Sequence, residues 1–253
     1  MEDYVDIISG LKIGISIGED DDMTIPKSLR LKELGADIIL HPAVDVRHIY
    51  SIEESVQNIE FLSKNCIYVH TSAGLGESST DLVYTGSTYI AQNGEVLRNN
   101  PAIFPMDCYE FEWISNFNNH TDEKYQVHKF PYLSDEEYSE YYLEEALDIQ
   151  ALGLIQRMKA VGTEKVFLGV SGGIDSTSAL LAIVRAYEIS GFDKAKIGAS
   201  TMPAFGTSDR TKSNAYLLSQ AFGIDLKEIN ISKSVTAHLH DICHDGKTAD
   251  LAY

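Results

Sequence analysis

The chain has 253 residues, of which 44% are hydrophobic and 23% charged, so it can bury a sizeable core in one large domain or two small ones. The formal net charge of −18 argues against a nucleic-acid partner, because phosphate backbones are bound through Lys and Arg. The sequence has no apolar stretch of membrane-spanning length and no signal-peptide pattern, and its three cysteines are scattered, so we expect a cytoplasmic protein without a membrane partner.

The first part of the chain, from about Lys12 to Ile103, has the pattern of a sheet interspersed with helices. Helices are predicted at Pro26–Leu34 and Ile52–Lys64, and the second has apolar residues at amphipathic spacing. The pair Asn93-Gly94 predicts a hairpin turn, because it suits positive φ at both turn positions. This part therefore ends in paired strands, and strands are expected within the runs KIGISI, ADIILH, NCIYVHTS, STYIAQ and EVLR.

The segment from about Pro101 to Leu133 is rich in Asn, Asp, His and Pro and lacks apolar periodicity, which predicts a loop. A long helix is expected next, since Ser134 and Glu137 have the spacing of a capping box. Acidic residues crowd its early turns, and we interpret them as a solvated helix face. An apolar stripe follows at Leu147, Leu154, Ile155 and Met158.

From Lys165 onward the pattern changes to alternating strands and helices. The run KVFLGV predicts a strand buried on both faces, and the helix after it is expected to stop at Gly191. Then KIGAST predicts a strand, Ser208–Phe222 a helix and LKEINI a third strand, and the last segment is expected to begin another helix. This alternation predicts a parallel sheet with right-handed crossovers.

The run GVSGGIDSTSALL places two glycines between the first of these strands and its helix. Ser171, Gly172 and Gly173 are expected to make the turn, and Asp175 or Ser176 to open the helix. In a parallel sheet, ligands bind beyond the carboxyl ends of the strands. Free backbone N–H groups and the positive helix end would meet there, and glycines let a phosphate approach the backbone, so the loop predicts an anion site.

This loop has neither the spacing of a Walker loop nor that of a dinucleotide fingerprint. It places an acid, Asp175, inside the phosphate cradle, where a carboxylate would repel phosphate unless a divalent cation lay between them. Mg²⁺ fits this role, because it binds a carboxylate together with phosphate oxygens. The alternative is a plain strand-turn-helix corner in which Asp175 serves as the N-cap.

The segment SGGIDS resembles the pyrophosphate-binding loop of the ATP pyrophosphatases, a group that contains NAD, GMP and asparagine synthetases and tRNA-thiolating enzymes. Longer blocks are more specific. The stretches DIQALGLIQRMKAVGTEKVFLGVSGGIDST and TMPAFGTSDRTKSNAYLLSQAFGIDLKEINI resemble the synthetase half of glutamine-dependent NAD synthetases. The stretches LKIGISIGEDDDMTIP and SAGLGESSTDLVYTGSTYIAQNGEVL resemble their nitrilase-like glutaminase half.

The resemblance implies an α/β protein with two domains. A partial nitrilase-like αββα domain would occupy residues 1–105 and a linker residues 106–133. An incomplete Rossmann-like, parallel-sheet ATP-pyrophosphatase domain, of the adenine nucleotide alpha hydrolase-like kind, would occupy residues 134–253. The family pattern extends beyond both ends of this sequence, so the resemblance also implies a chain truncated at both ends, and it implies a homo-oligomer.

The implied reaction begins when the carboxylate of deamido-NAD attacks ATP, which releases pyrophosphate and leaves an adenylated carboxylate. Ammonia, drawn from glutamine in the family, then attacks that carbonyl, and AMP departs. ATP and its pyrophosphate would be bound at one corner of the sheet by Ser171, Gly172, Gly173, Asp175, Ser176, Thr201 and Met202. Among these, Asp175 would hold Mg²⁺, and plain core packing is the alternative for Met202.

The glutaminase half departs from the family pattern. Its Cys nucleophile lies in an Ile-Cys-Glu-Asp stretch, and here Gly18 takes the place of that Cys. A glycine has no side chain, so no thioester can form there, and Glu19 would be a vestigial or structural acid. We therefore expect a synthetase whose glutaminase chemistry is lost. The alternatives are an inactive remnant that serves as an assembly module, and another ATP-pyrophosphatase amidotransferase.

Overall fold

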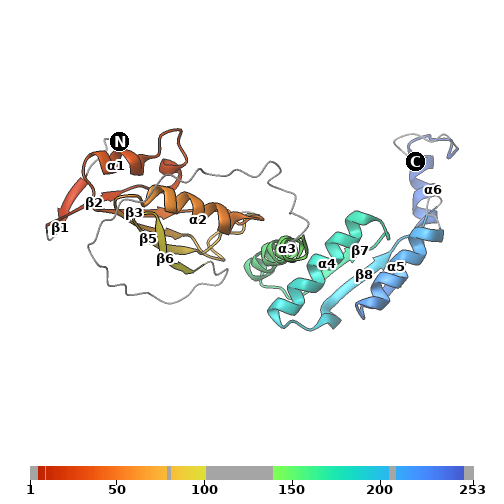
Figure 1. Cartoon of the computed structure of the whole chain (residues 1–253). Helices are drawn as coiled ribbons and strands as arrows, with labels where there is room; N and C mark the ends of the chain where they lie inside the picture. Colours follow the sequence, from red (N-terminus) through yellow and green to blue (C-terminus); the bar gives the residue numbers. More distant parts are fainter. Residues whose placement is uncertain (1–4, 9, 79–80, 101–138, 205–208, 248–253) are drawn as a thin grey trace. The chain divides into compact units, whose positions relative to one another are not determined.

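The computed structural model describes residues 5–8, 10–78, 81–100, 139–204 and 209–247 (Figure 1). The chain divides into two compact units, Met1–Ile149 and Gln150–Tyr253, and helix α3 (Ser139–Val161) contributes to both. The predicted loop at 101–133 and the predicted capping box at Ser134 lie outside the described residues. The predicted linker at 106–133 also lies outside the described residues, so the predicted domain boundaries on either side of it stay a proposal. No helix of the described part is long and apolar enough to span a membrane.

The first unit contains a six-stranded mixed sheet in the order β1-β2-β3-β4-β5-β6. The central strands β2, β3 and β4 are parallel and the outer pairs are antiparallel. The five predicted strands all form, and one more, β1, pairs with β2 across a turn in which Gly10 has a φ of +85°. The strands are β1 Val5–Ile8, β2 Leu11–Ile15, β3 Ile38–Ala43, β4 Ile67–Ser72, β5 Thr88–Gln92 and β6 Glu95–Asn100.

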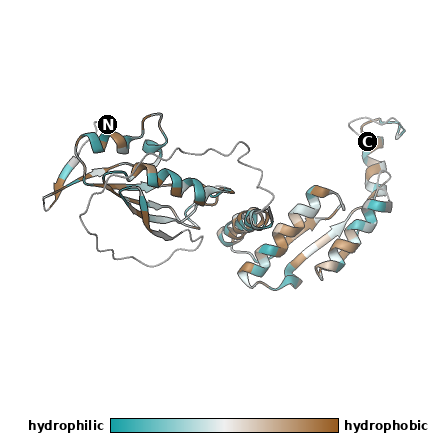
Figure 2. Ribbon diagram, viewed as in Figure 1, coloured by the Kyte–Doolittle hydropathy of each residue, from teal (hydrophilic) through white to brown (hydrophobic). Residues whose placement is uncertain are grey.

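Helices α1 (Lys27–Glu33) and α2 (Ser51–Leu62) cover one face of this sheet. Their buried residues share a core cluster with strand residues of that face: Leu31, Ile39, Ile59, Leu62, Tyr68 and Tyr89. Figure 2 shows that both helices carry hydrophilic as well as hydrophobic residues, as expected for helices with one buried side. On the opposite face Ile15 and Leu40 are exposed, since no helix of the described residues covers them.

The predicted hairpin turn is confirmed, because β5 and β6 pair with Gln92 opposite Glu95. Asn93 and Gly94 both have positive φ, 56° and 84°. Replacement of Gly94 by Ala is expected to lower the free energy of unfolding by about 1–2 kcal/mol, because a Cβ is strained in this conformation. Urea unfolding checks this, with Gly74→Ala as the matched control, since Gly74 lacks positive φ. Equal effects of the two substitutions would show that backbone strain is not the cause.

The second unit holds a three-stranded sheet in the order β7-β8-β9. Its strands are parallel, as the sequence predicted. Helices α3, α4 and α5 pack on one face of it around a core that includes Met158, Leu180, Ile183, Ala215 and Ile197. Helix α4 ends at Gly191, which has a φ of +67° and is the predicted stop. The elements are β7 Val166–Gly169, α4 Ile174–Ser190, β8 Ile197–Thr201, α5 Asp209–Ala221, β9 Leu226–Glu228 and α6 Ser232–Asp241.

Strand β7 corrects one prediction. We expected it to be buried on both faces, but Phe167 is 67% exposed, whereas Val166 and Leu168 pack against the core. The reason is that the helices of the described residues lie on one face of the sheet, and Phe167 points to the other. An apolar run was therefore not sufficient to predict double burial.

Helix α3 corrects part of another prediction. Its early acids were interpreted as a solvated face, and Glu140 and Glu144 are indeed exposed. Glu145, however, is only 8% exposed and pairs with Arg47, with 2.6 Å between Nη2 and Oε1. Tyr142, one turn earlier, packs its ring against Tyr50 with the centroids 4.2 Å apart. The first part of α3 is thus anchored to the first unit by buried polar and aromatic contacts.

Candidate functional site

The glycine loop lies between β7 and α4, at the carboxyl end of the parallel sheet. Gly172 has a φ of +82°, a conformation that side chains other than glycine rarely adopt. Gly173 has an extended backbone and forms the N-cap of α4, which begins at Ile174. We expected Asp175 or Ser176 to open the helix, with Asp175 as N-cap in the alternative. The predicted helix start and the alternative N-cap were both wrong by one or two positions. The Asp175 carboxylate therefore does not cap the helix.

The serines of the loop hydrogen-bond to one another and to its backbone. Ser171 Oγ lies 3.0 Å from Ser176 Oγ and accepts a hydrogen bond from the Gly173 N–H at 3.2 Å. Ser176 Oγ donates to the Gly173 carbonyl at 3.1 Å and accepts from the Ser171 N–H at 3.2 Å. Thr177 Oγ1 donates to the same Gly173 carbonyl at 2.8 Å. These contacts hold the two serine hydroxyls together in front of the helix N-terminus.

Asp175 lies in the first turn of α4 and is exposed. Its carboxylate has no hydrogen bond or ion pair with any residue that the structure describes. These groups fit a phosphate bound together with a divalent cation. An anion is favoured by the helix N-terminus, by the two hydroxyls and by a loop whose glycine has positive φ. The metal could be bound by the Asp175 carboxylate, which is not engaged by another described residue.

Thr201 and Met202 follow the loop on the neighbouring strand. Thr201 ends β8 and is buried, with its carbonyl accepting from the Ile229 N–H at 2.9 Å. Met202 is 46% exposed, and its Cε lies 3.3 Å from the position that a Cβ would take on Gly169. The structure therefore places Met202 beside the end of β7, where the glycine loop begins, and Thr201 within the sheet.

Gly18 lies in the first unit, after the carboxyl end of β2, and begins the short helix η1 (Gly18–Asp21). It has a φ of +57°, and a Cβ built on it would meet nothing within 4 Å. The residue lines a cavity of about 550 Å³, which is also lined by Glu19, His41, Asp45, Tyr68 and His70. The position predicted for the absent nucleophile therefore opens onto a polar cavity.

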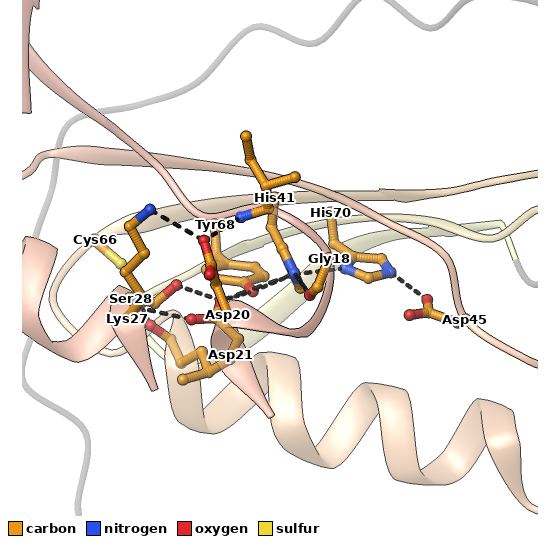
Figure 3. A network of polar contacts seen from close by, with 12 residues as sticks. Gly18, Asp20, Asp21, Lys27, Ser28, His41, Asp45, Cys66, Tyr68 and His70 are labelled. Carbon is orange, nitrogen blue, oxygen red and sulfur yellow. Dashed lines mark hydrogen bonds and ion pairs between the residues drawn. The ribbon is translucent and has the colours of Figure 1, made fainter. Parts of the chain in front are cut away.

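A network of hydrogen bonds forms the buried side of this cavity (Figure 3). Strands β3 and β4 place His41 opposite His70 in register, and their Nδ1 atoms lie 3.1 Å apart. Tyr68 OH lies 2.6 Å from His41 Nδ1 and 2.6 Å from Asp21 Oδ2. His41 Nε2 lies 2.9 Å from the Gly18 carbonyl, and His70 Nε2 lies 2.7 Å from Asp45 Oδ2. The network links Gly18 to both strands.

The ionisable groups in and beside this network differ in the direction of their pKa shifts. Burial opposes the ionised form of Asp45, but the hydrogen bond from His70 outweighs it, so the pKa of Asp45 is lowered. Burial, together with the neighbouring Asp21, raises the pKa of Tyr68, which stays a neutral phenol. Burial also raises the pKa of the Cys66 thiol to about 11, so this core cysteine is a poor nucleophile at neutral pH.

The residues of this network were not predicted as site residues from the sequence. Asp21 was not singled out in the run GEDDD, yet its side chain is buried and accepts from the Ser28 N–H at 2.8 Å and from the Ser28 hydroxyl at 2.5 Å. A signal for the histidines was available, since both lie near the ends of two strands that were predicted. Their pairing depends on a parallel register that the pattern alone does not give.

Comparison with known proteins finds similarity to one family in the second unit and over most of the chain. Residues 148–252 match the family model described as NAD synthase. The glutamine-dependent NAD(+) synthetase of Mycobacterium leprae is 30% identical over 96% of this chain and 42% of the relative. Its counterpart in Mycobacterium tuberculosis is 28% identical over 97% of this chain and 42% of the relative. The predicted resemblance is confirmed, and the chain spans well under half the length of the curated relatives it matches.

Solved structures show the same fold. The glutamine-dependent NAD+ synthetase of Acinetobacter baumannii, in complex with adenosine diphosphate, matches with a TM-score of 0.71 and 21% identity over 99% of this chain and 45% of that one. The enzyme of Cytophaga hutchinsonii matches with a TM-score of 0.62 and 17% identity over 95% of this chain and 42% of that one. The predicted α/β fold class, with its second part built on a parallel sheet, is confirmed.

Proposed function

We propose, from the premise that residues 148–252 match the NAD synthase family, that this chain carries the ATP-binding part of an NAD synthetase. The proposed reaction is the amidation of deamido-NAD through an adenylated intermediate, with release of AMP and pyrophosphate. The glycine loop supports this proposal most directly, because it joins glycine with positive φ, paired serine hydroxyls and a free carboxylate at one helix N-terminus. One of the similar solved proteins is in complex with adenosine diphosphate, which supports an adenine nucleotide as the class of ligand.

The roles of the residues follow from their positions. Gly172 and Gly173 would let phosphate oxygens approach the backbone N–H groups, and Ser171 and Ser176 would exchange their mutual hydrogen bond for bonds to the phosphates. Asp175 would hold Mg²⁺. When bound, the metal would neutralise charge on the departing pyrophosphate.

The neighbouring strand end would limit the site on one side. Met202 would contact the adenosine with its exposed thioether, and Thr201 would support the strand end from within the sheet. The protein would act in the cytoplasm, and a homo-oligomer is expected from the resemblance.

In the first unit we propose that glutaminase chemistry is absent. Gly18 offers a carbonyl and free space where the family has its nucleophile, and the described thiols, Cys66 and Cys243, lie elsewhere. Ammonia would then come from solution or from another protein. The purified chain is expected to release no ammonia from glutamine, and measurable release that depends on this chain would overturn this part of the proposal.

Titration of ATP with Mg²⁺ into the wild-type chain and into Asp175→Ala tests the synthetase proposal. The variant is expected to bind about tenfold or more weakly with the metal present, because it loses a metal ligand, and a tenfold loss corresponds to about 1.4 kcal/mol. Without metal the variant is expected to bind ATP at least as tightly as the wild type, because the carboxylate that repels the phosphates is gone.

Asp225→Ala is the matched control, since Asp225 is an exposed acid that precedes β9 and so lies at the opposite edge of the sheet. Its affinity is expected to equal that of the wild type. If Asp175→Ala also binds equally well with the metal present, the metal assignment is wrong. A folded chain that binds no nucleotide at all would instead favour a non-catalytic remnant.

A further inference from the structure

The peptide between Gly172 and Gly173 is the one peptide of the glycine loop that has a glycine on both sides. Because neither residue has a Cβ, this peptide plane can rotate at little steric cost, and local sterics do not decide which way its carbonyl and its N–H point. The direction matters for the proposed site, since an N–H attracts a phosphate oxygen and a carbonyl repels it. A contact from outside the two glycines is therefore needed to orient the peptide.

Asn214 of helix α5 makes such a contact, because its Nδ2 donates to the Gly172 carbonyl at 3.5 Å. A carbonyl only accepts hydrogen bonds, so the side-chain amide must turn its nitrogen toward it. In a trans peptide the carbonyl and the N–H point in opposite directions. With the Gly172 carbonyl directed at α5, the Gly173 N–H points to the other side, where it donates to Ser171 Oγ at 3.2 Å.

The two glycine carbonyls of the loop are held in different ways. The Gly173 carbonyl accepts from the Ser176 hydroxyl at 3.1 Å, from the Thr177 hydroxyl at 2.8 Å and from the Thr177 N–H at 3.1 Å. Among the described residues, the donor to the Gly172 carbonyl is Asn214. Helix α4 thus holds the Gly173 carbonyl with its own first turn, whereas the Gly172 carbonyl depends on a side chain from α5.

A cavity of about 450 Å³ lies between the loop and α5. It contains two polar side chains, and one of them, the Thr177 hydroxyl, is already bound to the Gly173 carbonyl. The other is Asn214, so it is the lining side chain that can hold the Gly172 carbonyl on this side. The cavity is lined by Gly172, Thr177, Asn214, Leu217, Leu218 and Ala221.

We propose that Asn214 is a positioning residue for the glycine loop, whose amide holds the Gly172 carbonyl away from the phosphates and so presents the Gly173 N–H to them. The inference rests on the proposed function, because the phosphates of a nucleotide are the ligand that this N–H would bind. A contact of 3.5 Å is long for a hydrogen bond, so Asn214 favours one orientation of the peptide without excluding the other. Its loss would leave part of the molecules with a carbonyl facing the ligand, which lowers the affinity.

The orientation of the peptide is tested first, in the ligand-free full chain. Asn214→Leu removes the donor at nearly unchanged size and adds no charge, and Asn214→Gln keeps an amide donor. Gln220→Leu is the matched control, since Gln220 is an exposed amide near the end of the same helix. Hydrogen exchange of the Gly173 amide is expected to become about threefold or more faster in Asn214→Leu alone. Equal exchange in the wild type and in Asn214→Leu would overturn the proposal.

Titration of ATP with Mg²⁺ tests the consequence for the ligand. Asn214→Leu is expected to bind about three- to tenfold more weakly than the wild type, because the competent orientation is less populated. Asn214→Gln is expected to restore most of the affinity, which a merely structural loss would not show. Equal affinities of the wild type and Asn214→Leu would overturn the positioning role.

Two further outcomes are decided by the same measurements. If the wild type binds no nucleotide while Gly173 exchange still responds to Asn214→Leu, the proposed function fails and the orientation of the peptide by Asn214 stands. If Asn214→Leu does not fold, the wild type decides. The side-chain amide protons of Asn214 are then expected to exchange more slowly than those of Gln220, after correction for intrinsic rates, and equal rates would overturn the proposal.

Discussion

Replacement of Asp21 by Ala is expected to lower the free energy of unfolding of the first unit by about 3–5 kcal/mol. The carboxylate is 1% exposed and accepts hydrogen bonds from the Ser28 N–H, the Ser28 hydroxyl and the Tyr68 hydroxyl. Its removal leaves three buried donors without their acceptor and takes away the anion that lies 3.8 Å from His41. Each unsatisfied donor costs about 1–3 kcal/mol, so a large loss is expected even after partial relaxation.

Urea unfolding of the two proteins, followed by signals of the first unit, gives the measurement. Asp20→Ala is the control, because this neighbouring carboxylate is 40% exposed, and it accepts hydrogen bonds from Lys27 and from the Ile17 N–H, each at 3.0 Å. Its loss is expected to cost about 1 kcal/mol or less. Similar losses for Asp20 and Asp21 would show that the buried network contributes no more to stability than a surface ion pair.

The two parts of the chain differed in how far they could be predicted from sequence. In the second unit the glycine loop was placed within a few residues, because alternating strands and helices define a parallel sheet and its ligand edge. The start of α4 at Ile174 was missed because N-cap preference points to Asp or Ser, whereas Gly173 with its extended backbone takes that position here.

The first unit shows what local patterns cannot supply. The predicted strands are present, but the cluster of His41, Tyr68 and His70 depends on which residues of β3 and β4 stand side by side. Burial of Asp21 depends on its contact with Ser28 in the next helix, and nothing in the run of acids distinguishes it from Asp20 or Asp22. Charged residues are exposed on average, and a charged residue is buried only where tertiary contacts provide it with partners.

Burial of a charged side chain could not be predicted in the first turns of α3 either, where Glu145 pairs with Arg47. A second large loss of stability is expected from a substitution in this pair. Arg47→Met is expected to lower the free energy of unfolding of the first unit by about 3–5 kcal/mol. The Arg47 and Glu145 side chains are 5% and 7% exposed, so the substitution leaves a buried carboxylate without its cation. Loss of the pair should also loosen the contact of Tyr142 with Tyr50, since both tyrosines flank it on the same two segments.

A double variant, Arg47→Met with Glu145→Met, distinguishes the pair from the packing around it. Removal of both charges leaves no buried ion, so the double variant is expected to be more stable than Arg47→Met and close to the wild type in urea unfolding. Proteolysis near Ser139–Val161 gives a second readout, because a loosened helix is cleaved faster. If the double variant is as unstable as Arg47→Met, the loss comes from the packing of the arginine stem, and the buried charge of Glu145 is not its cause.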